Sequence, residues 1–347
     1  MENNTASPKN ILKNPPVQII LFGIVLCLIQ VLSMNGVISS SFAFALGNTL
    51  IYAVMAIGFC LLLGYSGLAS LGTAGFIGIG TYAVYYIMQE NGYPLFLAFL
   101  VTLGISLGLG VVVGFISLRI EGIYLAILTL GLSEIIRNVL MAIKPTIKLE
   151  LANSRLFGIQ MNDRVAYFLI VIIYCLLMWV TSNLINSPTG RAMVAMKNST
   201  SAAQAMGISL MKFRLMAFVI ATVYAALGGL LYMVYVRNLT TSSSLLLTLT
   251  TSLNILGAVI IGGSKSLWGT FVGTFIIYGI QSMFLSRIPF FVKNPAFITM
   301  VTGVLIVVVV MFFPGGIAQI ASNISASFKK RKLAGAAAAA EEKKGEE

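Results

Sequence analysis

The stretch NSPTGRAMVAMKNSTSAAQAMGISLMKFR, from Asn186 to Arg214, is a polar and basic interruption between two very hydrophobic blocks of the chain. Its first half predicts a short helix over Arg191–Lys197. Its second half, SAAQAMG at Ser201–Gly207, predicts another short helix, with Ser201 and Gln204 as a capping box and Gly207 as the stop. A chain that keeps such helices between hydrophobic blocks is expected to dock something there.

The second predicted helix has a small apolar face made by Ala202, Ala205 and Met206. A surface helix resting on lipid is one interpretation of this pattern. The face is too small to bind a membrane strongly, and its small side chains allow another protein to approach the backbone. The pattern therefore favours a protein partner.

Composition identifies the two flanking blocks as membrane segments. Of 347 residues, 58% are hydrophobic and 9% are charged, and the mean hydropathy is +0.97. A soluble domain cannot cover that much apolar surface. Apolar runs of about 20 residues, long enough to cross a bilayer, occur about ten times. They lie near Val17–Met34, Phe42–Leu63, Leu68–Met88, Leu95–Leu118, Gly122–Ile143, Val165–Leu184, Leu215–Val236, Leu249–Gly262, Leu267–Leu285 and Ala296–Phe313.

The predicted fold is an all-α integral membrane protein, a polytopic bundle of about 8 to 10 transmembrane helices. The eighth run is short and predicts a re-entrant or broken helix. A transmembrane domain over residues 17–316 lies between an N-terminal segment, 1–16, and a basic, low-complexity tail, 317–347. Because basic loops stay in the cytoplasm, both termini and the loop 186–214 are expected inside, and the connector 144–164 outside.

Several function classes are excluded by what the sequence lacks. The net charge of +12 is spread over connectors, which favours anionic lipid headgroups over nucleic acid as partners. There is no His, Asp163 is the only Asp, and Cys27, Cys60 and Cys175 lie far apart in apolar runs, so no metal site or disulfide is expected. No phosphate-binding loop occurs, so any ATP must be bound by another subunit.

Small residues recur at three- and four-residue spacing from Gly64 to Gly80, in the run GYSGLASLGTAGFIGIG. Such spacing lets helix backbones approach closely, and glycine permits a break at membrane depth. Tight helix packing is the favoured interpretation. A solute path past Ser70 and Thr73 is the alternative.

Glu134 and Arg137 lie three residues apart inside an otherwise apolar run, on one helical face. Charges at that depth usually face a protein or water-filled interior. The pair could meet a zwitterionic solute, with the hydroxyls of Thr129 and Ser133 close by. A structural ion pair that orients the helix explains it equally well, so both interpretations stay open.

The order of several short motifs resembles the permease subunits of branched-chain amino acid ABC importers, of the LivM type, from about Leu50 to Gly316. The motifs are Gly64-Tyr65-Ser66-Gly67-Leu68 with Ser70-Leu71-Gly72, Gly122-Ile123-Tyr124, Thr129-Leu130-Gly131, Glu134-Ile135-Ile136-Arg137, Gly190-Arg191-Ala192, Ala202-Ala203-Gln204-Ala205-Met206-Gly207-Ile208, Gly262-Gly263 and Ser266-Leu267-Trp268-Gly269.

This resemblance implies a subunit of an importer in the bacterial plasma membrane that translocates branched-chain or other hydrophobic amino acids. The implied partners are two cytoplasmic ATP-binding subunits, which hold ATP and Mg, a second homologous permease and an external substrate-binding protein. The chain itself is expected to bind no cofactor and to catalyse no reaction.

The resemblance also assigns roles to residues. The segment Ser201–Gly207 is similar to the family's ATPase-coupling loop, with Ala202, Ala203 and Gly207 matching its two alanines and glycine, and Arg191 and Gln204 beside them. Ser201 stands where the general motif has glutamate. Thr73 stands where many relatives carry histidine. The helix from Ser199 to Gly207 is expected to act as a rigid lever.

Three other functions fit parts of the sequence pattern. A related permease for sugars or nucleosides shares much of this architecture. For a secondary transporter working without ATP, an inverted repeat with matching broken helices in both halves is expected. The division into six and four spans shows no obvious inverted repeat. An intramembrane enzyme would depend on Glu134, the only acid placed well within a span.

Overall fold

A bundle of long helices makes up most of the computed structural model, which describes residues 15–117, 122–150, 155–156, 159–160, 162–240, 245–284, 288, 291, 295–312 and 315–319. Six of its helices are long and apolar enough to cross a membrane. They are α2 (Pro15–Met34), α3 (Ser40–Phe59) with the π-helical turn η1 (Cys60–Tyr65), α5 (Leu95–Ser117), α6 (Ile123–Ile143), α7 (Asp163–Asn186) and α10 (Leu210–Val236). The predicted all-α membrane fold is confirmed.

The third predicted span differs from its prediction. Its first residues, from Leu68 to Gly72, are not helical, and α4 (Thr73–Tyr85) begins only afterwards and continues as the π-helical turn η2 (Tyr86–Glu90). Gly67 adopts a positive φ of 75°, a conformation that only glycine reaches without strain. A continuous helix from Leu68 was therefore the wrong expectation.

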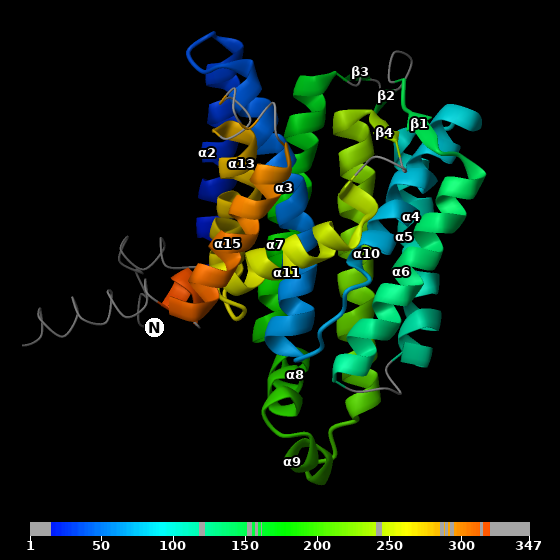
Figure 1. The fold of residues 1–347 in the computed structure, drawn as a ribbon, viewed down its shortest axis with the longest axis vertical. Coiled ribbons are helices and arrows are strands. Elements are labelled where there is room, and N and C mark those ends of the chain that lie inside the picture. Colours follow the sequence, from blue (N-terminus) through cyan, green and yellow to red (C-terminus); the bar gives the residue numbers. More distant parts are fainter. Residues whose placement is uncertain are drawn as a thin grey trace, which may run out of the picture.

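The eighth predicted span is short, as expected. After β4 (Asn238–Thr240) and the 3-10 turn η3 (Leu245–Leu247), helix α11 (Leu249–Gly262) has 14 residues. Figure 1 shows that it lies across the bundle, whereas α3, α7 and α10 run along it. The chain then forms α12 (Leu267–Thr274), the π-helical turn η4 (Phe275–Gly279), α13 (Ile280–Met283) and α15 (Pro295–Phe312).

The two interrupted helices, α4 and α11, meet at their N-termini inside the bundle. The amide of Ala74 donates a hydrogen bond to the Ser252 hydroxyl oxygen over 3.1 Å. Both halves of the chain therefore contain a broken helix, contrary to the expectation from the division into six and four spans. The break at α11 agrees with the prediction for the short eighth run.

The interrupted backbone between η1 and α4 takes its hydrogen bonds from several elements. The amide of Leu68 donates to Leu62 O over 3.1 Å, and the amide of Leu71 donates to Thr129 Oγ1 over 3.0 Å. The amide of Gly72 donates to Ser70 Oγ over 3.3 Å. Unpaired backbone groups are costly inside a membrane, so these bonds hold the break in place.

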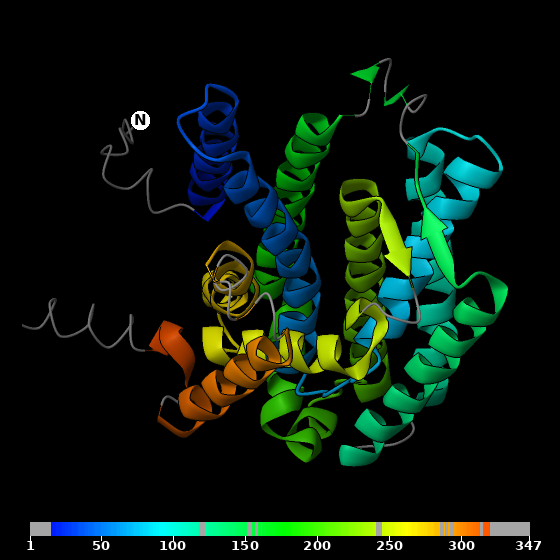
Figure 2. The ribbon, with the colours of Figure 1, turned by 45° about the horizontal axis from the view of Figure 1, so that its top comes forward.

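Glycines let the helices touch backbone to backbone. A Cβ on Gly64 would lie 1.7 Å from Ser264 O, and one on Gly80 would lie 1.9 Å from Ala226 O of α10. The packing interpretation of the run from Gly64 to Gly80 is confirmed at both positions. Helix α10 occupies the centre, next to α3, α4 and α5, as Figure 2 also shows.

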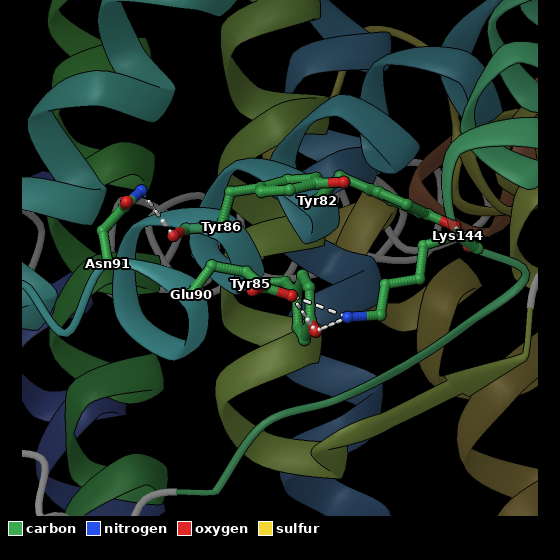
Figure 3. Close-up of polar contacts among 6 residues, drawn as sticks. All are labelled: Tyr82, Tyr85, Tyr86, Glu90, Asn91 and Lys144. Carbon is green, nitrogen blue, oxygen red and sulfur yellow. Dashed lines mark hydrogen bonds and ion pairs between the residues drawn. The ribbon is translucent and has the colours of Figure 1, made fainter.

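One end of the bundle, called the strand end below, is closed by short strands and a polar cluster. β1 (Thr146–Lys148) pairs antiparallel with β4, and β2 (Arg155–Leu156) pairs with β3 (Ile159–Gln160). Figure 3 shows Lys144, just after α6, donating to Glu90 over 2.6 Å and to the Tyr85 hydroxyl. The hydrogen bond from Lys144 lowers the pKa of the Glu90 carboxyl. The cluster fastens α6 to η2.

The opposite end carries α8 (Pro188–Asn198) and α9 (Thr200–Ala205), which project beyond the long helices in Figure 1. The predicted terminal segments, 1–16 and 317–347, lie almost wholly outside the described residues, and the connector 144–164 lies partly outside them. These domain assignments stay predictions.

Replacing Gly80 with alanine is expected to destabilise the protein by about 1 to 3 kcal/mol, because the new methyl group must push α4 away from α10. The matched control is Gly104→Ala in α5, where nothing lies within 4 Å of the new Cβ. That change is expected to be neutral or stabilising by up to about 1 kcal/mol. Thermal unfolding in detergent measures both, and equal melting temperatures would contradict the proposed backbone contact.

Candidate functional site: the projecting helix pair and the polar cavities

The local sequence explains why α8 forms. Ser187 precedes it in an extended conformation, and its hydroxyl oxygen accepts from the amide of Gly190 over 3.4 Å. Pro188 occupies the first helical position, where its missing N–H costs nothing. A Cβ on Gly190 would lie 2.2 Å from Ile185 O, so glycine lets α8 fold close against the end of α7. The predicted helix over Arg191–Lys197 is confirmed within α8.

Helix α9 is capped differently from the prediction. Ser199, not Ser201, is its N-cap, and the Ser199 hydroxyl oxygen accepts from the amide of Ala202 over 3.3 Å. Ser199 is the extended residue between α8 and α9, with φ −156° and ψ 113°, whereas Ser201 already lies inside the helix. The expected capping box of Ser201 and Gln204 is therefore wrong.

The end of α9 is as predicted. Gly207 adopts a positive φ of 79°, its amide donates to Gln204 O over 2.9 Å, and the amide of Ile208 donates to Ala203 O over 3.0 Å. This pair of bonds is a Schellman motif, which ends a helix at a left-handed glycine. These two bonds satisfy the last carbonyls of α9 and end the helix at Gly207.

The residues of α9 divide into two faces. Ala203 is only 2% exposed and points into the protein, whereas Met206 is 81% exposed. Ser201, Ala202, Gln204 and Ala205 are also exposed, as is Arg191 of α8, which donates to Asn186 O over 3.2 Å. The predicted apolar face is thus uncovered, but Ala203 does not belong to it.

Lys197 fastens this helix pair to the bundle. Its ammonium donates to Leu63 O over 3.1 Å and to Gly64 O over 2.8 Å, both in η1. Burial and the nearby Lys265 lower its pKa. Local pattern predicted Lys197 only as a basic loop residue, because its two carbonyl partners lie more than 130 positions earlier in the chain.

The same turn contacts the loop between α11 and α12. Cys60 donates to Ser264 O over 3.3 Å, Tyr65 donates to Lys265 O over 2.7 Å, and Gly64 packs directly on Ser264. A continuous set of contacts therefore joins α8, η1 and the end of α11.

Four of the predicted solute-path residues, Ser70, Thr73, Thr129 and Ser133, are buried around the start of α4. Ser70 and Thr73 line a small space with residues of α3 and α10, whereas Thr129 and Ser133 of α6 pack against Gly72 and Gly75. Thr129 accepts from Leu71 and donates to Ala126 O over 3.0 Å, and Ser133 lies where a Cβ on Gly75 would meet it. The space beside Ser70 and Thr73 is about 10 Å³, close to the volume of one water probe. Their role in transport stays a prediction.

Glu134 and Arg137 form the ion pair that both interpretations require, with Arg137 Nη1 and Glu134 Oε1 2.5 Å apart. The Glu134 side chain is 47% exposed and the Arg137 side chain 20% exposed. Both residues are partly covered and lie between the exposed Ile135 and the buried Ser133 on the surface of α6. A part in solute recognition stays a prediction.

Two polar cavities lie on the other side of the bundle, and the sequence reasoning did not identify them. The larger, about 780 Å³, is at the strand end between the ends of α2, α3 and α7. The smaller, about 310 Å³, lies deeper, between α3, α11, α13 and α15. Asn48 and Ser282 line both, so the two spaces adjoin. Asn48 and Asn254, carboxamides within apolar runs, were the signal that could have located them.

The described part of the chain offers no group of three or more His, Cys, Asp or Glu side chains that could hold a metal ion. Cys27, Cys60 and Cys175 are free thiols. The chemistry available here is therefore hydrogen bonding and packing.

A multi-span helical bundle with two interrupted helices, adjoining polar cavities and a projecting helix pair has the organisation of a membrane transport subunit. The family described as branched-chain amino acid transport system / permease component matches residues 41–310. The chain belongs to this family.

Two relatives support the assignment. The chain is 29% identical over 247 residues to the high-affinity branched-chain amino acid transport system permease protein LivM of Salmonella typhimurium, a match that covers 63% of this chain and 57% of that protein. It is 28% identical over 258 residues to the protein of the same name from Escherichia coli, with 66% and 60% covered. The matches thus span about three fifths of the relatives' length. No solved structure matches the chain.

Changing Lys197 to methionine is expected to destabilise the protein by roughly 2 kcal/mol, because two carbonyls inside the fold lose a charged donor. Amide hydrogen exchange in α8 is expected to accelerate at the same time. Lys212→Met, at an exposed position of α10, is the matched control and is expected to change neither. Unchanged exchange in α8 of the Lys197 variant would contradict the fastening role.

Proposed function

We propose that the protein is the membrane-spanning permease subunit of an ATP-driven importer for branched-chain or other hydrophobic amino acids. The observation that carries this proposal is the rigid, uncovered helix α9, presented at one end of a chain that belongs to the permease family. A secondary transporter has no need of such a platform. The family and the two relatives support the solute class.

The proposed partners follow from the two ends of the molecule. The end with α8 and α9 faces the cytoplasm and receives one of two ATP-binding subunits, which hold ATP and Mg. Arg191, Lys197, Lys212 and Arg214 gather there without any acidic residue between Asn186 and Arg214, as expected of a cytoplasmic loop. The strand end faces outward toward a substrate-binding protein, and a second homologous permease completes the channel in the bacterial plasma membrane.

Movement would pass from the ATPase to the cavity through contacts already described. Closure of the ATP-binding subunits displaces α9, and α8 follows because the two helices are joined at Ser199. Lys197 transmits the displacement to η1, and Gly64 transmits it to Ser264 at the end of α11. Helix α11 begins in the wall of the deeper cavity, so a shift of this helix changes access to it.

Two alternatives need separate tests. Broken helices in both halves are present, as a secondary transporter predicts, so this feature alone does not distinguish the two mechanisms. Dependence of uptake on ATP distinguishes the proposed importer from a secondary transporter. A permease for sugars or nucleosides is separated by competition, in which unlabelled leucine, and not ribose or a nucleoside, is expected to reduce uptake of labelled leucine.

Cysteine at position 205 is expected to cross-link to the ATP-binding subunit in a manner sensitive to ATP, because Ala205 is on the exposed face of α9. Ala203→Cys is the matched control, since this position is on the same helix but only 2% exposed. Cross-linking in membranes with a short bifunctional thiol reagent measures both. No ATP-sensitive product from position 205 would refute α9 as the docking helix.

A further inference from the structure

We propose that the cavity of about 310 Å³ between α3, α11, α13 and α15 is the solute site within the membrane, and that it takes the zwitterion of an aliphatic amino acid. The identity of the solute rests on the function proposed above. The site itself rests on the lining of the cavity. Its volume is within the range of small-molecule sites.

The cavity is polar but carries no charge. Its lining residues are amides, hydroxyls and apolar side chains, and no acidic or basic residue is among those described: Asn48, Tyr52, Leu246, Thr250, Thr251, Asn254, Tyr278, Gln281, Ser282, Ile298, Thr299 and Thr302. A solute with a net charge would lose its hydration there without gaining a counter-ion, which is costly in a medium of low dielectric constant. The lining therefore selects solutes of zero net charge.

Polar atoms in the wall have unused hydrogen-bonding capacity. The carboxamide oxygen of Asn48 is covered and has no hydrogen-bond partner in the part of the chain that the structure describes, and the covered hydroxyl of Tyr278 lies beside the Asn254 side chain. Buried polar groups without partners are rare, and a bound ligand is one explanation for them. The oxygen of Asn48 can accept from an ammonium group, and the hydroxyl of Tyr278 can donate to a carboxylate.

Helix α11 adds a second group suited to a carboxylate. Thr250 and Thr251 of its first turn line the cavity. The helix dipole favours an anionic group there. Helix α4 differs, because Ser252 accepts from its Ala74 amide and the space beside its start is only about 10 Å³. Of the two interrupted helices, only α11 begins beside a cavity large enough for a solute.

The cavity can be reached from the strand end and is bounded along α11 by apolar side chains. The larger cavity adjoins it through Asn48 and Ser282, which provides a route from the strand end. Beyond Asn254, one turn further along α11, Ala258 and Ile261 pack with Ile277 and Ile306. Because α11 lies across the bundle, this apolar layer bounds the cavity sideways along α11. The described contacts thus provide a route to the site from the strand end.

The test uses the complete importer in proteoliposomes, with ATP inside and labelled leucine supplied through the binding protein. Leucine moved per ATP hydrolysed is measured. Asn48→Leu, which preserves size and removes the acceptor, is expected to lower this ratio roughly tenfold, the effect of losing one hydrogen bond to a charged group. Tyr278→Phe, which removes only a hydroxyl, is expected to lower it in the same direction, so the test does not depend on one variant folding.

The matched control is Tyr174→Phe. The Tyr174 hydroxyl is also covered and without a partner, but it lies beside Phe22 and Phe271 and lines neither cavity. Its loss is expected to leave transport per ATP unchanged. If both Asn48→Leu and Tyr278→Phe move as much leucine per ATP hydrolysed as the wild type, the proposed solute site is overturned.

Failure of the proposed function gives a different result. If the wild-type importer moves ribose and not leucine, the amino-acid assignment is overturned. The same variants measured with ribose then decide the site: a lowered ratio supports a site for uncharged solutes, and an unchanged ratio overturns it.

Discussion

Backbone that leaves helical geometry inside a membrane has no water to bind, so the protein must supply every partner itself. In this chain the constraint acts on the segment between η1 and α4. Within it the amide of Leu71 bonds to Thr129 of α6. On its two sides, the amide of Ala74 in α4 bonds to Ser252 of α11, and the carbonyls of Leu63 and Gly64 in η1 bond to Lys197 of α8. The interruption thereby becomes the point at which the coupling helix, the interrupted helix α11 and the outer helix α6 are joined.

The two interrupted helices have different consequences because their surroundings differ. Glycines let α4 pack directly against α6 and α10, which leaves a space of about one water beside its start. Helix α11 begins beside Tyr52 and Tyr278, whose stacked rings, 3.7 Å apart, form part of a roomy polar wall. The break before α4 therefore joins neighbouring elements, and the start of α11 provides the wall of the proposed solute site. In the proposed mechanism, Lys197 and Ser264 connect them to the ATPase.

The sequence predicted the features that depend on local pattern. Apolar run length located the six full spans and the short α11, and the Gly207 stop followed from glycine's access to positive φ. Features that depend on distant contacts were not predictable in the same way. The Lys197 bonds join residues more than 130 positions apart, and the cavity gathers side chains from four helices. Ser199 was not predicted as the cap because Ser201, with Gln204 three residues later, matches the capping-box pattern, whereas Ser199 is followed at that distance by Ala202.

The central claim is that nucleotide binding at the α9 end controls access to the cavity beside α11. The most direct measurement is the alkylation rate of a single cysteine at Thr299, an exposed lining residue, in an importer whose Cys27, Cys60 and Cys175 are alanine. The reagent is added from the strand end, with and without nucleotide trapped on the ATP-binding subunits. We predict rates that differ severalfold between the two states. Equal rates would contradict the account.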